Sequence, residues 1–308
     1  MKKAEPNTLQ IQRSVKTLVT PNDLLTKRLF HIPADKFTRM IQAGRSDKID
    51  EKITVKKRKV EVITKYWLEL VDDGFADMMP LDEFDRAVAD VCISIQDAGF
   101  GGTTLGGINR LLSGGKRFDT KLYPSRKEKI MRSLEKLMGM RIKVDFTALQ
   151  ATGVYPNLPK SGKLIDMVLP CRIIEGLKVN GQRGVDAVFF RGESPLLTIA
   201  RAKNQQLLSY PVALLDVPKQ NNTELVTKVK FHVTRWVHAV KTHKELKPTI
   251  VLETLYKNCG LGDANNDKKR KARKIARAVF EHLKAQGVIL EFDFEKVDGI
   301  YRAIKFRY

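Results

Sequence analysis

Residues 268–277 include seven cationic side chains, and their type and spacing indicate a binding role more clearly than those of any other segment. Between them, small and apolar residues recur three or four positions apart, at Ala272, Ile275, Ala276 and Val279, which predicts a helix with one face on a core. Lysine and arginine neutralise phosphates, and arginine can also recognise guanine through paired N–H groups. The pattern therefore predicts a helix that binds nucleic acid, with a solvated charged face as the alternative. The cations are Lys268, Lys269, Arg270, Lys271, Arg273, Lys274 and Arg277.

A second basic helix is predicted to begin at Ser125, because a serine followed three positions later by Glu128 matches a capping box. Apolar residues such as Ile130 and Leu134 give this helix a core face, and its cations are equally compatible with DNA contact and with a solvated face. They are Arg126, Lys127, Lys129, Arg132 and Lys136. Two further cations, Lys296 and Arg302, lie in a predicted hairpin near the end of the chain, where they would reach backbone phosphates or would be ordinary sheet-surface charges.

The elements around these helices occur twice in a similar order. The first set is a strand at 60–70, a helix from about 82 to 95, a short helix at 105–112 capped by Thr103 or Thr104, the helix from Ser125, and a strand at 142–146. Further strands are expected at 164–171, 187–190 and 196–199, with Asn180-Gly181 as a hairpin turn, and these strands are expected to extend the first sheet.

The second set begins with a long helix capped by Thr223. A short helix at 250–259 follows, then a helix at 267–286 ended by Gly287, and then strands at 288–294 and 300–308 joined through Asp298-Gly299. Three helices followed by a hairpin are typical of a winged helix, whose second and third helices form a helix-turn-helix. The sequence thus predicts an α+β protein with an N-terminal arm (1–51), a first winged-helix domain (52–216) and a second (217–308).

The composition favours a polyanionic partner. The chain of 308 residues has 56 Lys+Arg against 35 Asp+Glu, a net charge of +21, with an ordinary hydrophobic content of 43%. An anionic membrane is disfavoured because we find no basic amphipathic helix with a bulky apolar face. No run approaches the roughly 20 apolar residues of a transmembrane helix, and Cys92, Cys171 and Cys259 form no CxxC pair, so we expect a cytoplasmic protein with buried, reduced thiols.

No catalytic or metal-binding pattern emerges from the sequence. Gly114-Gly115-Lys116 suggests a phosphate loop, but Arg110 stands where that motif requires glycine. His232, His238 and His243 are spaced by six and five residues, which does not place them on one metal-binding face of a helix. We therefore expect a protein that is not an enzyme and uses no cofactor or metal.

Two stretches resemble bacterial plasmid replication initiators with tandem winged helices. They are PLDEFDRAV at residues 80–88, and SRKEKI at 125–130 leading to RIKVD at 141–145. The resemblance implies a protein that binds repeated duplex DNA sites at an origin, promotes opening and recruits host replication proteins, a helicase or an initiator. It also implies a first domain that mediates homodimerisation and a second that reads a major groove. A winged-helix transcriptional regulator and an RNA-associated basic protein are the alternatives, and the role of the arm stays open.

Overall fold

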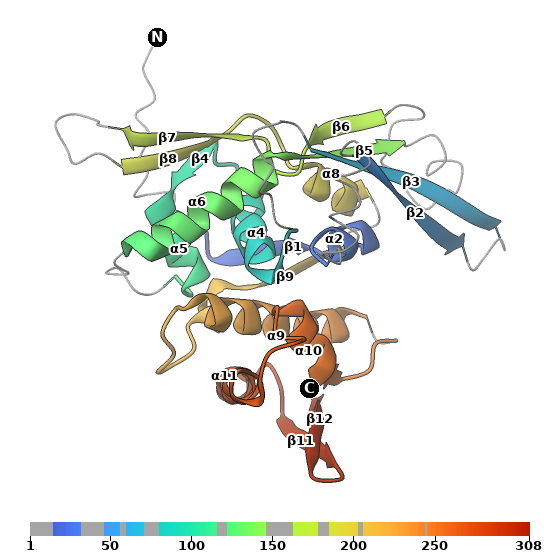
Figure 1. Ribbon diagram of the computed structural model, residues 1–308, viewed down its shortest axis with the longest axis vertical. Coiled ribbons are helices and arrows are strands. Elements are labelled where there is room, and N and C mark those ends of the chain that lie inside the picture. The colour runs from blue at the N-terminus through green and yellow to red at the C-terminus, as the bar shows by residue number, and fades with distance from the viewer. Residues whose placement is uncertain are drawn as a thin grey trace.

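The computed structural model describes residues 15–31, 46–55, 60–70, 80–115, 122–145, 163–177, 185–202, 206–243 and 245–308. Helices and antiparallel strands are mixed along the chain, as the sequence predicted. In Figure 1 the elements from α9 onwards form one end of the molecule, and the earlier elements form the other end. No helix in these ranges is long and apolar enough to span a membrane.

The last part of the chain folds as a unit with the predicted order of elements. A two-residue turn at Asp298 and Gly299, with φ of 52° and 76°, joins its last two strands, as a tight hairpin requires. The last strand lies in the middle of the sheet, in the order β10-β12-β11. The elements are α9 (Glu224–Thr242), β10 (Thr249–Val251), α10 (Leu252–Asn258), α11 (Asn266–Ala285), β11 (Glu291–Val297) and β12 (Ile300–Arg307).

An earlier part of the chain repeats this arrangement. Its sheet has the order β4-β8-β7, so the last strand again lies in the middle. Apart from β5 and β6, two strands that follow α6 and belong to another sheet, both units run helix, strand, helix, helix, strand, strand. The elements of the first unit are α4 (Glu83–Asp97), β4 (Gly102–Thr104), α5 (Leu105–Leu112), α6 (Pro124–Met138), β7 (Cys171–Leu177) and β8 (Val185–Phe190).

A separate four-stranded sheet is built from segments on both sides of α4 to α6. Its order is β2-β3-β5-β6, with every neighbouring pair antiparallel. The expectation that all strands between 163 and 215 extend one sheet was therefore wrong: β6 joins this sheet, whereas β7 and β8 pair with β4. The strands are β2 (Ser46–Val55), β3 (Val60–Leu70), β5 (Met140–Asp145) and β6 (Lys163–Met167).

Part of the predicted arm belongs to the folded core. Strand β1 (Thr17–Pro21) pairs with β9 (Leu207–Pro211), and helix α2 (Leu24–Leu29) follows it. Leu18, Leu29 and Phe30 are fully buried. A turn of 3-10 helix, η2 (Val212–Leu215), then leads toward α9.

Helix boundaries differ from expectation at three places. The stretch expected to be a strand at 196–199 is helix α8 (Pro195–Ala202), because Pro195 suits a first helical position and the Ser194 hydroxyl accepts from the backbone N–H of Leu196. Helix α6 is preceded by Tyr123 with Pro124 at its start, so Ser125 forms no capping box. Ile250 lies in a strand rather than in the helix that follows it.

Other boundary predictions were confirmed. Thr104 and Thr223 cap α5 and α9 through their hydroxyl groups. Gly287 adopts a positive φ of 68° after α11. The predicted turn at Asn180-Gly181 lies outside the described residues.

Candidate nucleic-acid interface

Helix α11 is fixed on the core by its inner face. Its N-cap is Asn265, whose side chain accepts from the backbone N–H of Lys268 at 3.1 Å. The ring of Phe280 lies 5.2 Å from that of Phe292 and 5.6 Å from that of Phe306, so the helix packs directly on the hairpin β11–β12. The buried stripe is Ala272, Ile275, Ala276, Val279, Phe280 and Leu283.

The opposite face of α11 carries the predicted cations. Five of the seven are exposed, and Lys269 and Arg273 are half-buried. Among the described residues, Asp267 is the only carboxylate in an ion pair with any of the seven; it lies 2.9 Å from the guanidinium of Arg270, one turn away. The face therefore presents a dense positive charge that its own surroundings leave largely uncompensated. The exposed members are Lys268, Arg270, Lys271, Lys274 and Arg277.

Aromatic rings hold the half-buried cations in place. The guanidinium of Arg273 donates to the Tyr256 hydroxyl at 2.8 Å and lies 5.2 Å from the ring centroid of Tyr301. The ammonium of Lys269 lies 5.6 Å from the ring of Tyr256. Cations stacked on rings keep their charge and lose freedom of movement, so the aromatic residues of α10 and β12 orient the cations of α11.

The hairpin continues the same basic surface. Lys296 lies 4.5 Å from the ring of Tyr301, and Arg277 of α11 lies 4.6 Å from the ring of Phe294 in β11. Lys296 and Arg302 are exposed, and among the described residues neither is paired with a carboxylate.

The hairpin tip adds a feature that the sequence reading did not identify. Val297 and Ile300 face each other across the turn and are 48% and 55% exposed. An exposed apolar pair flanked by Lys296 and Arg302 suits contact with the sugars and bases of a groove.

The predicted cations of α6 are placed differently. Arg126 is only 8% exposed and lies between three helices. Its guanidinium donates to the side chains of Asn109 in α5 and Thr227 in α9, each at 3.1 Å, and lies 4.8 Å from the ring of Phe84 in α4. Burial lowers the pKa of Arg126 to about 10. This side chain serves the junction of the two units, and its inclusion among DNA contacts was wrong.

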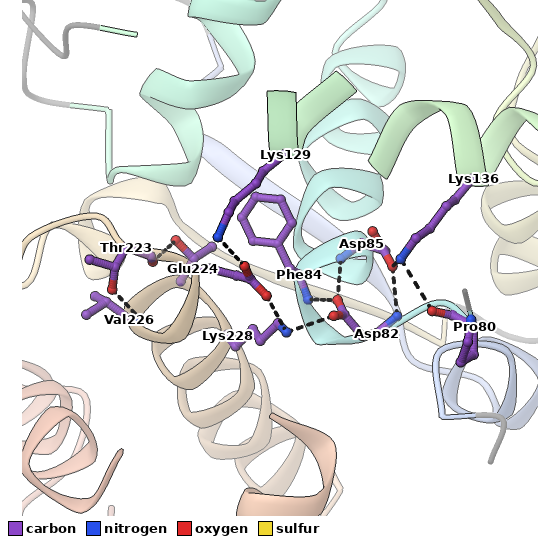
Figure 2. Close-up of polar contacts among 11 residues, drawn as sticks. Pro80, Asp82, Phe84, Asp85, Lys129, Lys136, Thr223, Glu224, Val226 and Lys228 are labelled. Atoms are coloured by element: carbon purple, nitrogen blue, oxygen red, sulfur yellow. Dashed lines mark hydrogen bonds and ion pairs between the residues drawn. The ribbon is translucent and has the colours of Figure 1, made fainter. Parts of the chain in front are cut away.

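Three more cations of α6 are bound to carboxylates. Lys129 lies 2.5 Å from Glu224 of α9, Lys136 lies 2.7 Å from Asp85 of α4, and both contacts are drawn in Figure 2. Lys127 pairs with Asp186 of β8 at 2.8 Å. Arg132, by contrast, is exposed and has no ion-pair partner among the described residues.

Glu224 lies at the centre of the contact between the units. Lys228 bridges it to Asp82 at 2.7 Å on each side (Figure 2). Burial alone would raise the pKa of Glu224, but hydrogen bonds from Lys129 and Lys228 lower it to about 2. The carboxylate therefore stays ionised and ties α6 to α9.

A buried ion network completes the junction. Arg235 of α9 contacts Glu83 at 2.5 Å and Asp90 at 2.8 Å, both in α4, and the Thr20 hydroxyl of β1 donates to Asp90 at 2.6 Å. Burial opposes the charge on Glu83, yet Arg235 holds the pKa of Glu83 far below its usual range. Glu83 lies in the first turn of α4, where an acidic residue is common, and nothing in the local pattern indicates a partner 152 residues away.

The described part of the chain contains no group of side chains arranged for metal binding or thiol chemistry. No three His, Cys, Asp or Glu side chains are grouped there as metal ligands. Cys92, Cys171 and Cys259 are buried and unpaired, as expected.

Comparison with known proteins gives little guidance. No family model matches the chain, and no curated protein is similar to it. A crystal structure of domains 2–3 of RctB is similar, with a TM-score of 0.40 and 10% identity over 86% of this chain and 92% of that one. A selenomethionine derivative of domains 2 and 3 of RctB gives a TM-score of 0.39 and 13% identity over 85% and 91%. Scores this low assign neither fold nor function.

Proposed function

We propose that the chain is a replication initiator that binds repeated duplex DNA sites at an origin, and that its two repeated units are winged helices. The main support for DNA binding is the cationic face of α11, which lies opposite a buried stripe and beside a basic hairpin. In this proposal α11 enters a major groove and the hairpin β11–β12 is the wing.

The cost of this charge supports a binding role. Cations in the first turn of a helix oppose the helix macrodipole, at about 0.3–1 kcal/mol each when exposed. Lys268 and Lys269 lie in the first turn of α11, and all seven cations repel one another. A polyanion would offset both costs by releasing counterions when its phosphates bind.

The proposed contact set is narrower than the one from sequence. It keeps the seven cations of α11 together with Lys296 and Arg302 of the wing. Arg132 of α6 can add a peripheral contact, while Lys127, Lys129 and Lys136 are committed to Asp186, Glu224 and Asp85.

The replication part of the proposal rests on the resemblance of residues 80–88 and 125–145 to plasmid initiators. It assigns the first unit to homodimerisation, and it assigns duplex opening and recruitment of a host helicase or initiator to the assembled protein. The reaction needs no active site in this chain, since the opened strands would be acted on by the recruited proteins.

Two successive experiments test the proposal. Competition binding with duplex DNA, single-stranded DNA and RNA of matched length should show preference for the duplex; preference for RNA would favour an RNA-associated protein. Duplexes selected for tight binding should then contain a repeated site, and a plasmid carrying that site array should replicate when the chain is supplied in trans. Binding to the array without replication would instead favour a transcriptional regulator.

A further inference from the structure

One row of exposed side chains on α11 has an acid at each end. Positions 267, 270, 274, 277 and 281 are three and four residues apart, so they follow one face of the helix. All five are exposed, and the row lies opposite the buried stripe, so it is the part of α11 farthest from the core. This outward row consists of Asp267, Arg270, Lys274, Arg277 and Glu281.

The two arginines of the outward row have different neighbours. Arg277 lies 4.6 Å from the ring of Phe294, on the side of the hairpin. Arg270 has no ring contact among the described residues, and its Nη2 lies 2.9 Å from Oδ1 of Asp267, one turn earlier. A guanidinium has five N–H donors, so this one contact leaves an edge of Arg270 available to a ligand.

The pair of Asp267 and Arg270 contributes little to stability, because both side chains are well exposed. Its main effect is to restrict where the guanidinium lies. A carboxylate on this face would be repelled by phosphates, but it suits the base edges of a major groove, where the N4 amino group of cytosine is a donor. The acid therefore fits a position over base edges better than one beside the backbone.

We propose that Arg270 selects guanine and that Asp267 is its positioning residue, an inference that rests on the proposed binding of α11 in a major groove. Recognition helices contact base edges with their N-terminal residues, and Arg270 is the first cation of the outward row. Guanine presents O6 and N7 as two acceptors in the major groove, and they match two N–H groups of a guanidinium. Phosphate contacts from other cations of α11 would position the protein without selecting sequence.

Selection of bound duplexes from a random library, with the full chain, tests the proposal. The sites selected by wild type should contain guanine at a fixed position. Arg270→Lys keeps the charge but loses the planar fork, so it should relax the preference at that position and retain the others. Its affinity for the wild-type site should fall about tenfold or more, and its affinity for unrelated duplexes should fall far less.

Arg307→Lys is the matched control. Arg307 is also an exposed arginine of the second unit with a carboxylate partner, since its Nε lies 2.5 Å from Oε1 of Glu291. It lies outside the proposed contact set. The variant should therefore select the same sites as wild type with the same affinity.

Asp267→Asn tests the positioning role. It should broaden the preference at the position that Arg270→Lys relaxes, and it should leave the Tm near that of wild type because the pair is exposed. In the Arg270→Lys background the same change should have no further effect on that preference, because Asp267 acts through Arg270. An equal effect in both backgrounds would contradict the positioning role.

The outcomes separate this inference from the proposed function. A guanine preference that survives Arg270→Lys would overturn the assignment, and so would wild-type protein that binds duplex DNA without selecting guanine at any position. Either result leaves duplex binding by α11 in place. Wild-type protein that does not bind duplex DNA would contradict the proposed function, and this inference with it.

Discussion

Helices α6 and α11 occupy the same place in their units, and both are rich in cations, yet the two sets of cations meet different surroundings. In α6, carboxylates of α4, β8 and α9 bind Lys136, Lys127 and Lys129. In α11, aromatic rings contact three of the cations, and among the described residues one aspartate pairs with one of the seven. A basic helix is therefore available to a polyanion only where its neighbours leave its charge uncompensated.

We expect the largest effect on stability from a substitution in the buried ion network at the contact between the two units. Arg235→Ala leaves Glu83 and Asp90 buried without their cation, and we expect a loss of about 3–5 kcal/mol in the free energy of unfolding. Urea unfolding measures this loss. Arg201→Ala is the control, because Arg201 pairs with Asp97 and Glu193 at the surface, and should cost no more than about 1 kcal/mol. Similar small losses in both variants would contradict the assignment of the junction to Arg235.

Single substitutions in the two helices should have opposite consequences. Arg126→Ala leaves Asn109 and Thr227 without their donor and should destabilise the protein by about 1–3 kcal/mol. Lys274→Ala, on the exposed face of α11, should change stability by no more than about 0.5 kcal/mol. Duplex affinity of the folded proteins should fall for Lys274→Ala and stay near wild type for Arg126→Ala. The reverse pattern would exchange the roles that we assign to the helices.

Acid should weaken the contact between α6 and α9 by a smaller amount. The pKa of Glu224 is lowered from its ordinary value of 4.5 to about 2, so its stabilising effect is complete above about pH 4.5 and is lost as the pH falls toward 2. The stability difference between wild type and Glu224→Gln should shrink over that range. Glu128→Gln, an exposed site on α6, serves as the matched control. If the stability difference between wild type and Glu224→Gln did not vary with pH, the ion pairs of Glu224 with Lys129 and Lys228 would contribute nothing to stability.

The sequence predicted much of the second unit because its signals are local. The stripe through Ala272 and Leu283 and the turn at Asp298-Gly299 are determined by nearby residues, and both agree with the structure. The seven cations of α11 indeed lie together on one helix.

Long-range partners could not be predicted in the same way. The pattern around Arg126 is that of an ordinary basic helix, and only the packing of α9 against it shows that the side chain is buried. Likewise Pro195 and Ser194 determined a helix that the β-prone composition of residues 196–199 concealed. The number of cations can be counted from a sequence. Whether a cation is paired with a carboxylate depends on segments about a hundred residues away, as in the pair of Lys129 and Glu224.

The most direct test is the salt dependence of duplex binding. Removing one cation that binds a phosphate should reduce the slope of log K against log salt concentration by about 1. The double variant Lys271→Ala, Lys274→Ala in α11 should therefore lower the slope by about 2. The matched double variant Lys127→Ala, Lys129→Ala in α6 removes the same charge from internal ion pairs and should leave the slope unchanged. Equal slopes for wild type and the α11 variant, or a larger change for the α6 variant, would contradict the assignment of DNA contact to α11.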